Sequence, residues 1–186
     1  GEAGQHTLQF FAERVEGNLL AAHQEIQKLG LLYPPGELTF EQVERAVLNV
    51  ARYDVFKLSE AVLSGQPLRV QRMLDGLKAE GEAEVLVHYA LAEDIRALKR
   101  VKDAVAAGKA LPMVLREQRI WGAREKLFER VLPRMSVGLL EKLLQSAQQV
   151  DGIVKGLKVA DWPTDNWQAL HRLAMRVCRA CMARAA

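Results

Sequence analysis

The sequence predicts an all-α protein, and three observations carry this prediction. Apolar residues recur with a helical period along almost the whole chain, no segment of useful length alternates between apolar and polar residues, and no solenoid repeat is present. The 186 residues are 49% hydrophobic and 26% charged, which suits a chain that buries a core and stays soluble. We expect a small three-helix unit followed by about six more helices.

The N-terminal part predicts the three short helices. Residues 6–16 place apolar side chains on one face, and residues 19–29 form a second stripe, with Asn18 as a plausible N-cap. A Tyr-Pro-Pro-Gly stretch is then expected to end this helix. The next helix is expected to begin at Thr39, and Gln42 stands three residues later, as a capping box requires.

A boundary between two units is expected at 49–53, which divides the chain into 1–50 and 51–186. This link is short and not rich in Gly or Pro, so we expect the two units to keep a preferred angle, although motion between domains is the usual default. The next helix should run from about Asp54 to Leu63, because Ser-Gly-Gln-Pro follows as a stop and restart signal.

Downstream of this helix, apolar stripes and stop signals define the remaining elements. The segment 111–132 forms either two short helices or one bent helix, and Ser136 and Thr164 are expected to cap the last two long helices. The predicted helices cover 67–79, 84–106, 111–132, 136–158 and the segment after Thr164.

Charge is unevenly distributed between the two units. Residues 1–52 hold four Lys or Arg against seven Asp or Glu, a net −3, and residues 53–186 hold 22 against 16, a net +6. The basic second part suits an acidic partner such as nucleic acid. An ordinary solvated surface with extra arginines explains a surplus of this size at least as well.

Catalytic chemistry has little support. Cys178 and Cys181 form a C-x-x-C at the end of a predicted helix, without the second ligand pair that zinc needs or the preceding strand of a redox motif. The phosphate-binding glycine motifs are absent. Packing or surface roles fit each of the histidines, which are His6, His23, His88 and His171. We expect no cofactor and no metal.

The location expected from these features is cytoplasmic. The chain starts without a secretory signal, and no apolar run approaches the length that spans a membrane. Two cysteines are too few for a disulfide framework, so a reducing compartment is the default.

The segment Arg-Glu-Gln-Arg-Ile-Trp-Gly-Ala-Arg, residues 116–124, is the one constellation that points to a ligand. It places the indole of Trp121 among guanidinium groups, and an exposed indole beside arginines is a stacking platform for an unpaired base. A core tryptophan surrounded by surface arginines is the alternative. Candidate nucleic-acid contacts are therefore Arg119, Trp121 and Arg124.

Several stretches together resemble one family, the delta subunit of the bacterial DNA polymerase III clamp loader. They are RVEGNLLAAHQEIQKLGLL (14–32), YDVFKLSEAVLSG (53–65), REQRIWGAREKLFERVL (116–132) and LLEKLLQSAQQVDGIVKG (139–156). The resemblance covers nearly the whole chain and is most specific in the RVEGNLLAA and RIW segments.

The resemblance implies a domain assignment. Residues 1–50 would be the three-helix lid of an AAA+-type protein and residues 51–186 the helical collar, so the chain would be a C-terminal fragment. In the family, the N-terminal core binds and opens the sliding clamp, and that core is not part of this sequence. Gly17 stands at about the position where ATP-hydrolysing relatives carry an arginine that reaches the phosphates, so the resemblance implies a non-hydrolysing subunit.

The resemblance also implies partners. The collar would close a ring with the clamp-loader ATPase subunits and a delta-prime-type subunit, and it would lie near the primed or single-stranded template in the assembled complex. Candidates for the collar interface are Leu139, Leu143, Val150 and Trp167, with a core role as the alternative for each. Two other classes remain: a free-standing helical nucleic-acid-binding module, and an enzyme using Cys178 or a histidine, which the sequence disfavours.

Overall fold

The computed structural model describes residues 5, 19–33, 35–36 and 38–182. Within this part the chain forms eight α-helices and one 3₁₀ helix, without strands, so the all-α prediction is confirmed. None of the described helices is both long enough and apolar enough to cross a lipid bilayer. The predicted helix at 6–16, the Asn18 cap and Gly17 lie outside the described residues.

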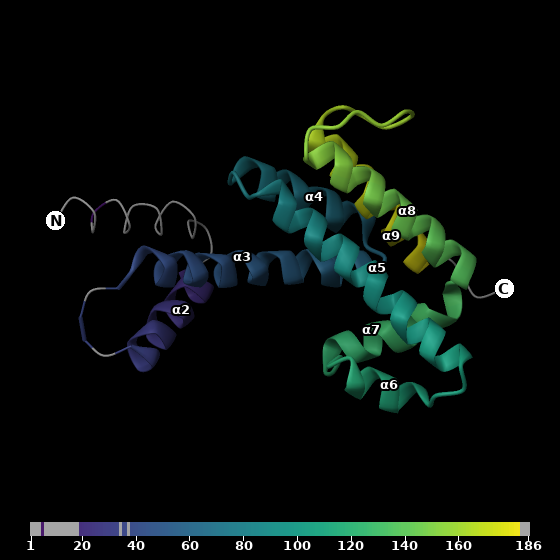
Figure 1. The fold of residues 1–186 in the computed structure, drawn as a ribbon, viewed down its shortest axis with the longest axis horizontal. Coiled ribbons are helices and arrows are strands. Elements are labelled where there is room, and N and C mark those ends of the chain that lie inside the picture. The colour runs from purple at the N-terminus through teal and green to yellow at the C-terminus, as the bar shows by residue number, and fades with distance from the viewer. Residues whose placement is uncertain (1–4, 6–18, 34, 37, 183–186) are drawn as a thin grey trace.

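The first described helices, α2 (Leu19–Leu32) and α3 (Phe40–Leu63), pack against each other and extend from one side of the molecule (Figure 1). The predicted capping box is present at the start of α3. Thr39 Oγ1 accepts a hydrogen bond from Gln42 N at 3.3 Å, and Thr39 N donates to Gln42 Oε1 at 2.8 Å.

The expected new helix near Asp54 is wrong, because α3 continues without a break for 24 residues. No Gly or Pro lies within Phe40–Leu63, so nothing in the local sequence stops the helix. The division into 1–50 and 51–186 stays a prediction, and its boundary falls inside this helix.

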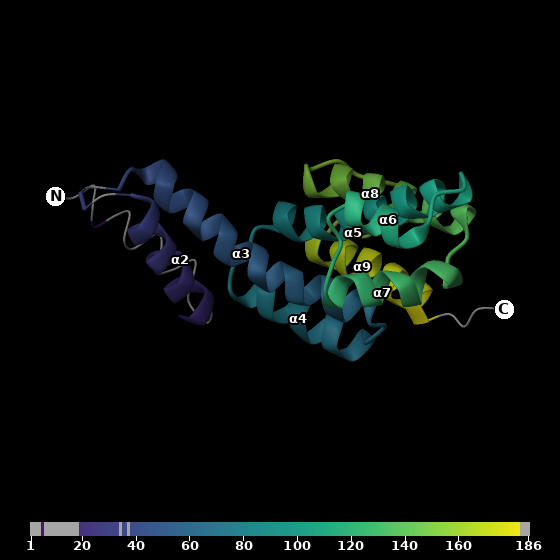
Figure 2. The same ribbon diagram turned by 90° about the horizontal axis from the view of Figure 1, so that it is seen from below.

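The rest of the chain is a bundle in which the C-terminal half of α3 takes part. Helix α5 (Glu84–Ala106) lies at its centre and contacts α8 (Val137–Val154), α9 (Asn166–Met182) and α3, while α4 (Pro67–Ala79) packs on α3 and α9 (Figures 1 and 2). The core is made of side chains that these helices bury together, among them Leu58, Ile95, Leu140 and Leu170.

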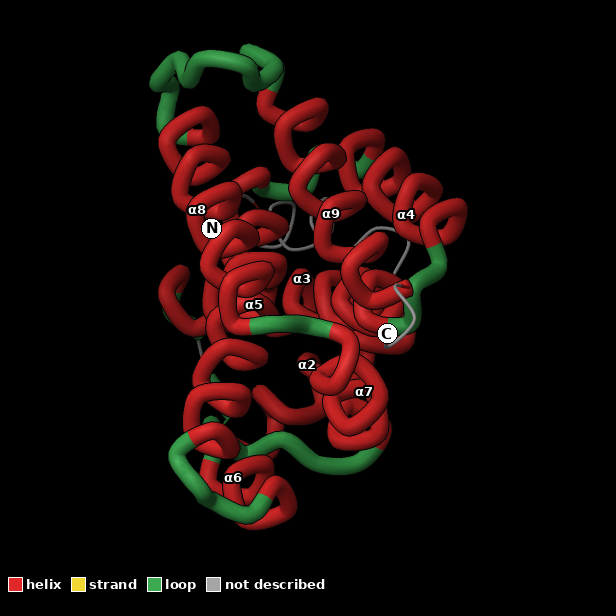
Figure 3. Tube along the Cα trace, turned by 90° about the vertical axis from the view of Figure 1, so that its right-hand side faces the viewer, coloured by secondary structure: helices red, strands yellow, loops and turns green. Residues whose placement is uncertain are grey.

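Two short helices close one end of the bundle. They are α6 (Leu111–Glu117) and α7 (Ala123–Val131), with the 3₁₀ turn Leu132–Arg134 leading on to α8 (Figure 3). The predicted segment 111–132 is therefore two helices joined by a loop at 118–122. Phe128 of α7 is fully buried and fixes this end to the core.

The caps of the last two helices differ in how well they follow the prediction. Ser136 caps α8 as expected, since its hydroxyl accepts a hydrogen bond from Leu139 N at 3.1 Å. Thr164 does not cap α9. Asp165 does so, because its carboxylate accepts from Gln168 N at 2.9 Å and an aspartate is an equally good cap one residue later.

Candidate functional site

The conformation of the loop between α6 and α7 places the side chain of Trp121 in solvent. Arg119 ends α6 with a left-handed φ of 56°, and Ile120 N then donates to Leu115 O at 2.8 Å while the Ile120 side chain is buried. Gly122 follows with φ 65° and ψ −136°, a conformation that favours glycine. With both neighbours fixed in this way, Trp121 between them is 65% exposed, which excludes the core alternative.

Two further exposed aromatic side chains lie around the same hollow. Phe56 of α3 is 61% exposed and Tyr89 of α5 is 58% exposed. Together with Trp121 and Arg119 they line a groove of about 740 Å³, which we call the aromatic groove. Phe56 and Trp121 also border a second, smaller hollow of about 330 Å³. Three large apolar rings are thus presented to solvent from three separate parts of the chain.

Arg124 lines the aromatic groove but is engaged with a buried carboxylate. Its Nη2 lies 2.8 Å from Asp94 Oδ1, and its Nη1 donates to Ser59 Oγ at 3.1 Å. Ser59 Oγ in turn donates to Asp94 Oδ2 at 2.6 Å. The guanidinium also lies 5.0 Å from the centre of the Phe128 ring. The expectation of a free Arg124 that neutralises a phosphate therefore differs from the structure, because this charge already has a partner.

Asp94 is an unusual residue for the centre of a helical bundle, since it is only 2% exposed. Burial raises the pKa of this carboxyl, and the charge of Arg124 and the hydroxyl of Ser59 oppose that shift. A paired and fully hydrogen-bonded carboxylate at this place ties α3, α5 and the start of α7 together. It therefore supports the loop that carries Trp121.

Of the three candidate nucleic-acid contacts, Arg119 and Trp121 stay available. Arg119 is exposed and forms no ion pair among the described residues. Spacing alone could not show that Arg124 is bound to a residue 30 positions earlier.

The four candidates for the collar interface fall into two groups. Leu143 and Val150 are 4% and 0% exposed and belong to the core of this chain, so they are not on its surface. Leu139 and Trp167 are partly buried and pack against the core from outside. The interface role stays a prediction for all four, and direct contacts by Leu143 and Val150 would need the bundle to open.

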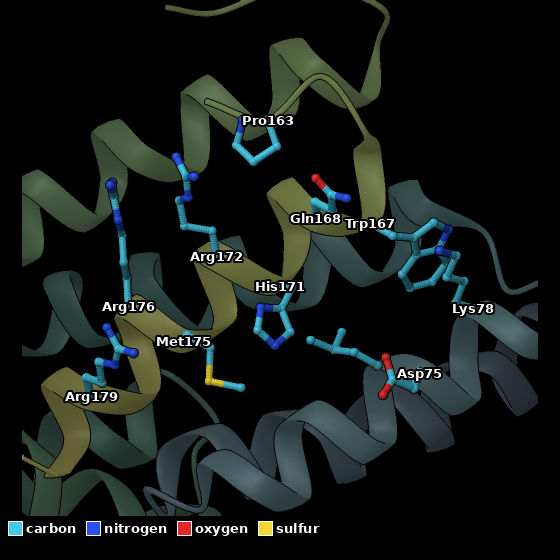
Figure 4. Close-up of a pocket in the computed structure, with 11 residues that line it drawn as sticks. Asp75, Lys78, Pro163, Trp167, Gln168, His171, Arg172, Met175, Arg176 and Arg179 are labelled. Carbon is cyan, nitrogen blue, oxygen red and sulfur yellow. The ribbon is translucent and has the colours of Figure 1, made fainter. Parts of the chain in front are cut away.

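A second groove lies between α4 and α9, with a volume of about 670 Å³. Figure 4 shows Arg172, Arg176 and Arg179 following one another along α9, and Lys78 on α4. These four residues define what we call the basic groove. This groove was not predicted from the sequence, although the arginine spacing of four and three residues marks one face of a helix.

The cysteines and the buried histidine have packing roles. Cys178 and Cys181 are buried free thiols, and burial raises the pKa of Cys181 to about 12 and also raises that of Cys178. Both thiols are therefore held in their unreactive protonated form. His88 is buried between α5 and α8, where its Nε2 lies 2.7 Å from Ala147 O.

Two curated proteins are similar in sequence to this chain. No protein-family model matches the chain. The chain is, however, homologous to a subunit of a bacterial DNA polymerase. That subunit is DNA polymerase III subunit delta: the Escherichia coli K12 protein is 29% identical over 163 residues, which are 88% of this chain and 46% of the relative.

A second relative agrees with the first. DNA polymerase III subunit delta from Haemophilus influenzae is 25% identical over 185 residues, which are 95% of this chain and 53% of the relative. The chain thus spans about half the length of the curated relatives it matches.

Proposed function

We propose that this chain is the C-terminal part of a clamp-loader delta subunit, with residues 1–50 as the lid and residues 51–186 as the collar. The observation that carries the proposal is the similarity to DNA polymerase III subunit delta, which covers most of this chain but only about half of each relative. The clamp-binding core would then be the other half. The chain has no catalytic task of its own, and it works in the cytoplasm, close to the nucleoid.

The collar would assemble with the ATPase subunits and the delta-prime-type subunit of the loader. The continuous helix α3 supports this proposal, because it joins the lid to the bundle without a flexible link. Leu139 and Trp167, which pack on the core from outside, are the sequence candidates that can also contact a neighbour. Such a collar holds the complex together without nucleotide.

The aromatic groove would contact the template strand. Exposed Trp121, Phe56 and Tyr89 offer flat apolar faces on which unpaired bases stack, a contact that tolerates any base. Arg119 supplies a nearby positive charge for a phosphate. Arg124 acts differently from our expectation: it positions the loop of Trp121 through its ion pair with Asp94.

Light scattering after size-exclusion chromatography tests the assembly. The chain is mixed, without ATP, with a collar-bearing ATPase subunit from the same source. A stable hetero-complex is expected. Two folded components that elute separately would contradict the collar assignment, and the matched control is the same mixture with the ATPase subunit truncated before its collar.

A second candidate function, a free-standing nucleic-acid-binding module, is favoured by the basic groove. It predicts that the chain alone binds single-stranded DNA with an affinity that falls steeply with salt, and that it forms no hetero-complex. Formation of the hetero-complex therefore separates the candidates.

A further inference from the structure

The basic groove holds four positive charges, none of which forms an ion pair among the described residues. Within the described part of the chain, Lys78, Arg172, Arg176 and Arg179 form no ion pair, and Asp75 is the single acidic residue of the lining. The net charge of the lining is therefore +3, four cations against one carboxylate. Like charges along one groove repel each other, so this arrangement favours an extended anion that runs along them.

The cations of α5 show that this chain pairs surface charges elsewhere. Arg96 and Arg100 both contact Glu93, at 3.2 Å and 2.7 Å, and Lys99 contacts Asp103 at 2.6 Å. None of the four groove cations has a carboxylate partner of this kind among the described residues.

Two of the arginines are also held in place. Arg172 lies 5.3 Å and Arg176 lies 4.6 Å from the centre of the Trp162 ring. Arg172 Nη1 donates to Asp161 O at 2.6 Å, and Arg176 Nη1 donates to Ser146 Oγ at 3.0 Å. Each guanidinium keeps further N–H groups for a ligand, and its conformational entropy is already restricted before the ligand arrives.

The chemistry of the lining selects the kind of anion. None of the large exposed apolar side chains of the described surface lies in the basic groove, where Leu74 is buried and Trp167 and Met175 are partly buried. A partner helix needs apolar anchors in its groove. Contacts to the nucleic-acid backbone are instead mainly electrostatic and need no apolar anchor.

Base stacking is also disfavoured at this place. The indole of Trp162 already carries two guanidinium groups, and its Nε1 donates to Gln149 Oε1 at 2.9 Å. On α9 the three arginines follow one another over roughly 10 Å of helix axis. The lining therefore offers a line of charges, and its own indole, Trp167, is partly buried against the core.

We propose that the basic groove binds the sugar–phosphate backbone of nucleic acid without reading its bases. The four cations contact successive phosphates and release the counterions of the strand. This site is distinct from the aromatic groove, and it does not depend on the clamp-loader assignment, because the chain alone carries all of its residues.

Fluorescence anisotropy with labelled oligo(dT), in single-stranded form and as a duplex with oligo(dA), tests this site over a series of salt concentrations. The test variant is Lys78→Gln with Arg179→Gln, since both side chains are exposed and neither stacks on Trp162. The matched control is Lys126→Gln with Lys142→Gln, which changes the net charge equally at exposed positions that line neither groove.

The test variant should lose affinity by roughly tenfold, and the slope of log affinity against log salt should fall by about two. A loss with either form of DNA supports backbone contact, and the form with the larger loss is the preferred ligand. An equal loss in the control, or no loss in the test variant, would overturn the proposal. The proposal would also be overturned if the test variant bound polyglutamate more weakly than the wild type while its DNA affinity stayed unchanged. That result would assign the groove to an acidic protein segment.

A third titration, with Trp121→Ala, distinguishes the contribution of the aromatic groove to DNA affinity from that of the basic groove. This variant should keep the wild-type salt slope, because it removes a ring and no charge. If the wild-type chain formed no hetero-complex with the ATPase subunit, the clamp-loader assignment would be rejected, but the DNA titrations would be unaffected. The two proposals can therefore fail independently.

Discussion

The aromatic groove and the basic groove differ in which groups face solvent. In the aromatic groove, three large rings face solvent, and the paired charges of Asp94 and Arg124 lie below them. In the basic groove, the charges face solvent and an indole lies beneath two of them. An arginine near an aromatic ring therefore does not define a nucleic-acid contact until its own partners are known.

Removing the buried carboxylate should have the largest effect. Asp94→Ala leaves the Arg124 charge partly buried without its partner, and breaking a buried ion pair in this way costs about 3 kcal/mol of unfolding free energy. Urea denaturation measures the change. Asp103→Ala is the control, because it breaks an exposed pair with Lys99 that contributes about 0.5 kcal/mol. Equal losses would mean that Asp94 is no support for the loop.

Trp121→Ala should come next, and its effect should appear in binding and not in stability. A stacked base contributes about 1–3 kcal/mol, so the assembled loader should bind primed template roughly 5- to 150-fold more weakly. The unfolding free energy should stay within about 0.5 kcal/mol, since the indole is exposed. Leu157→Ala, which shortens another exposed apolar side chain, is the control. Unchanged DNA affinity would remove the stacking role.

A side chain added at Gly122 should have a smaller effect on the free energy of unfolding. At Gly122 a Cβ would meet no atom within 4 Å, so Gly122→Ala tests the left-handed backbone alone and should cost about 1–2 kcal/mol. Gly138→Ala in α8 also meets no atom, but there alanine favours the helix and should stabilise by about 0.5–1 kcal/mol. Thermal unfolding of both variants checks the opposite signs. If both stabilised, the loop would not be held in the described conformation.

The smallest effect is the pH dependence that Asp94 adds. Burial raises its pKa in the folded protein, so its contribution to stability is complete below the pKa of an unfolded aspartate. The contribution is lost as the pH rises through the folded-state pKa. The unfolding free energy of the wild type relative to Asp94→Asn should therefore fall with rising pH. A difference that grows with pH would mean that Arg124 lowers this pKa more than burial raises it.

Local signals in the sequence were enough for most of the helices. The Thr39 capping box, the Ser136 cap and the Gly-Pro breaks each act within a few residues, so they can be read directly. The continuity of α3 was missed because a change in charge along the chain does not interrupt a helix. Asp165 was missed as a cap because Thr164 beside it is equally suitable by type.

The two grooves were harder to predict, for a physical reason. The aromatic groove joins Phe56, Tyr89 and Trp121, and only the last of these lies in the arginine-rich segment 116–124 that predicts a ligand. The basic groove needs Lys78 of α4 beside an α9 that starts almost 90 residues later. Neither partner is visible from spacing, because the packing of distant helices brings these residues together.

Helix α3 has a mechanical consequence for any assembly that holds this chain at both ends. Its 24 residues form a rod roughly 36 Å long, so a tilt of about 10° at the α2 end moves the opposite end by roughly 6 Å. Phe56 and Ser59 lie near that opposite end, in the lining of the aromatic groove. A rotation of α2 together with the start of α3 would therefore move the groove that carries Trp121, because α3 is continuous between them.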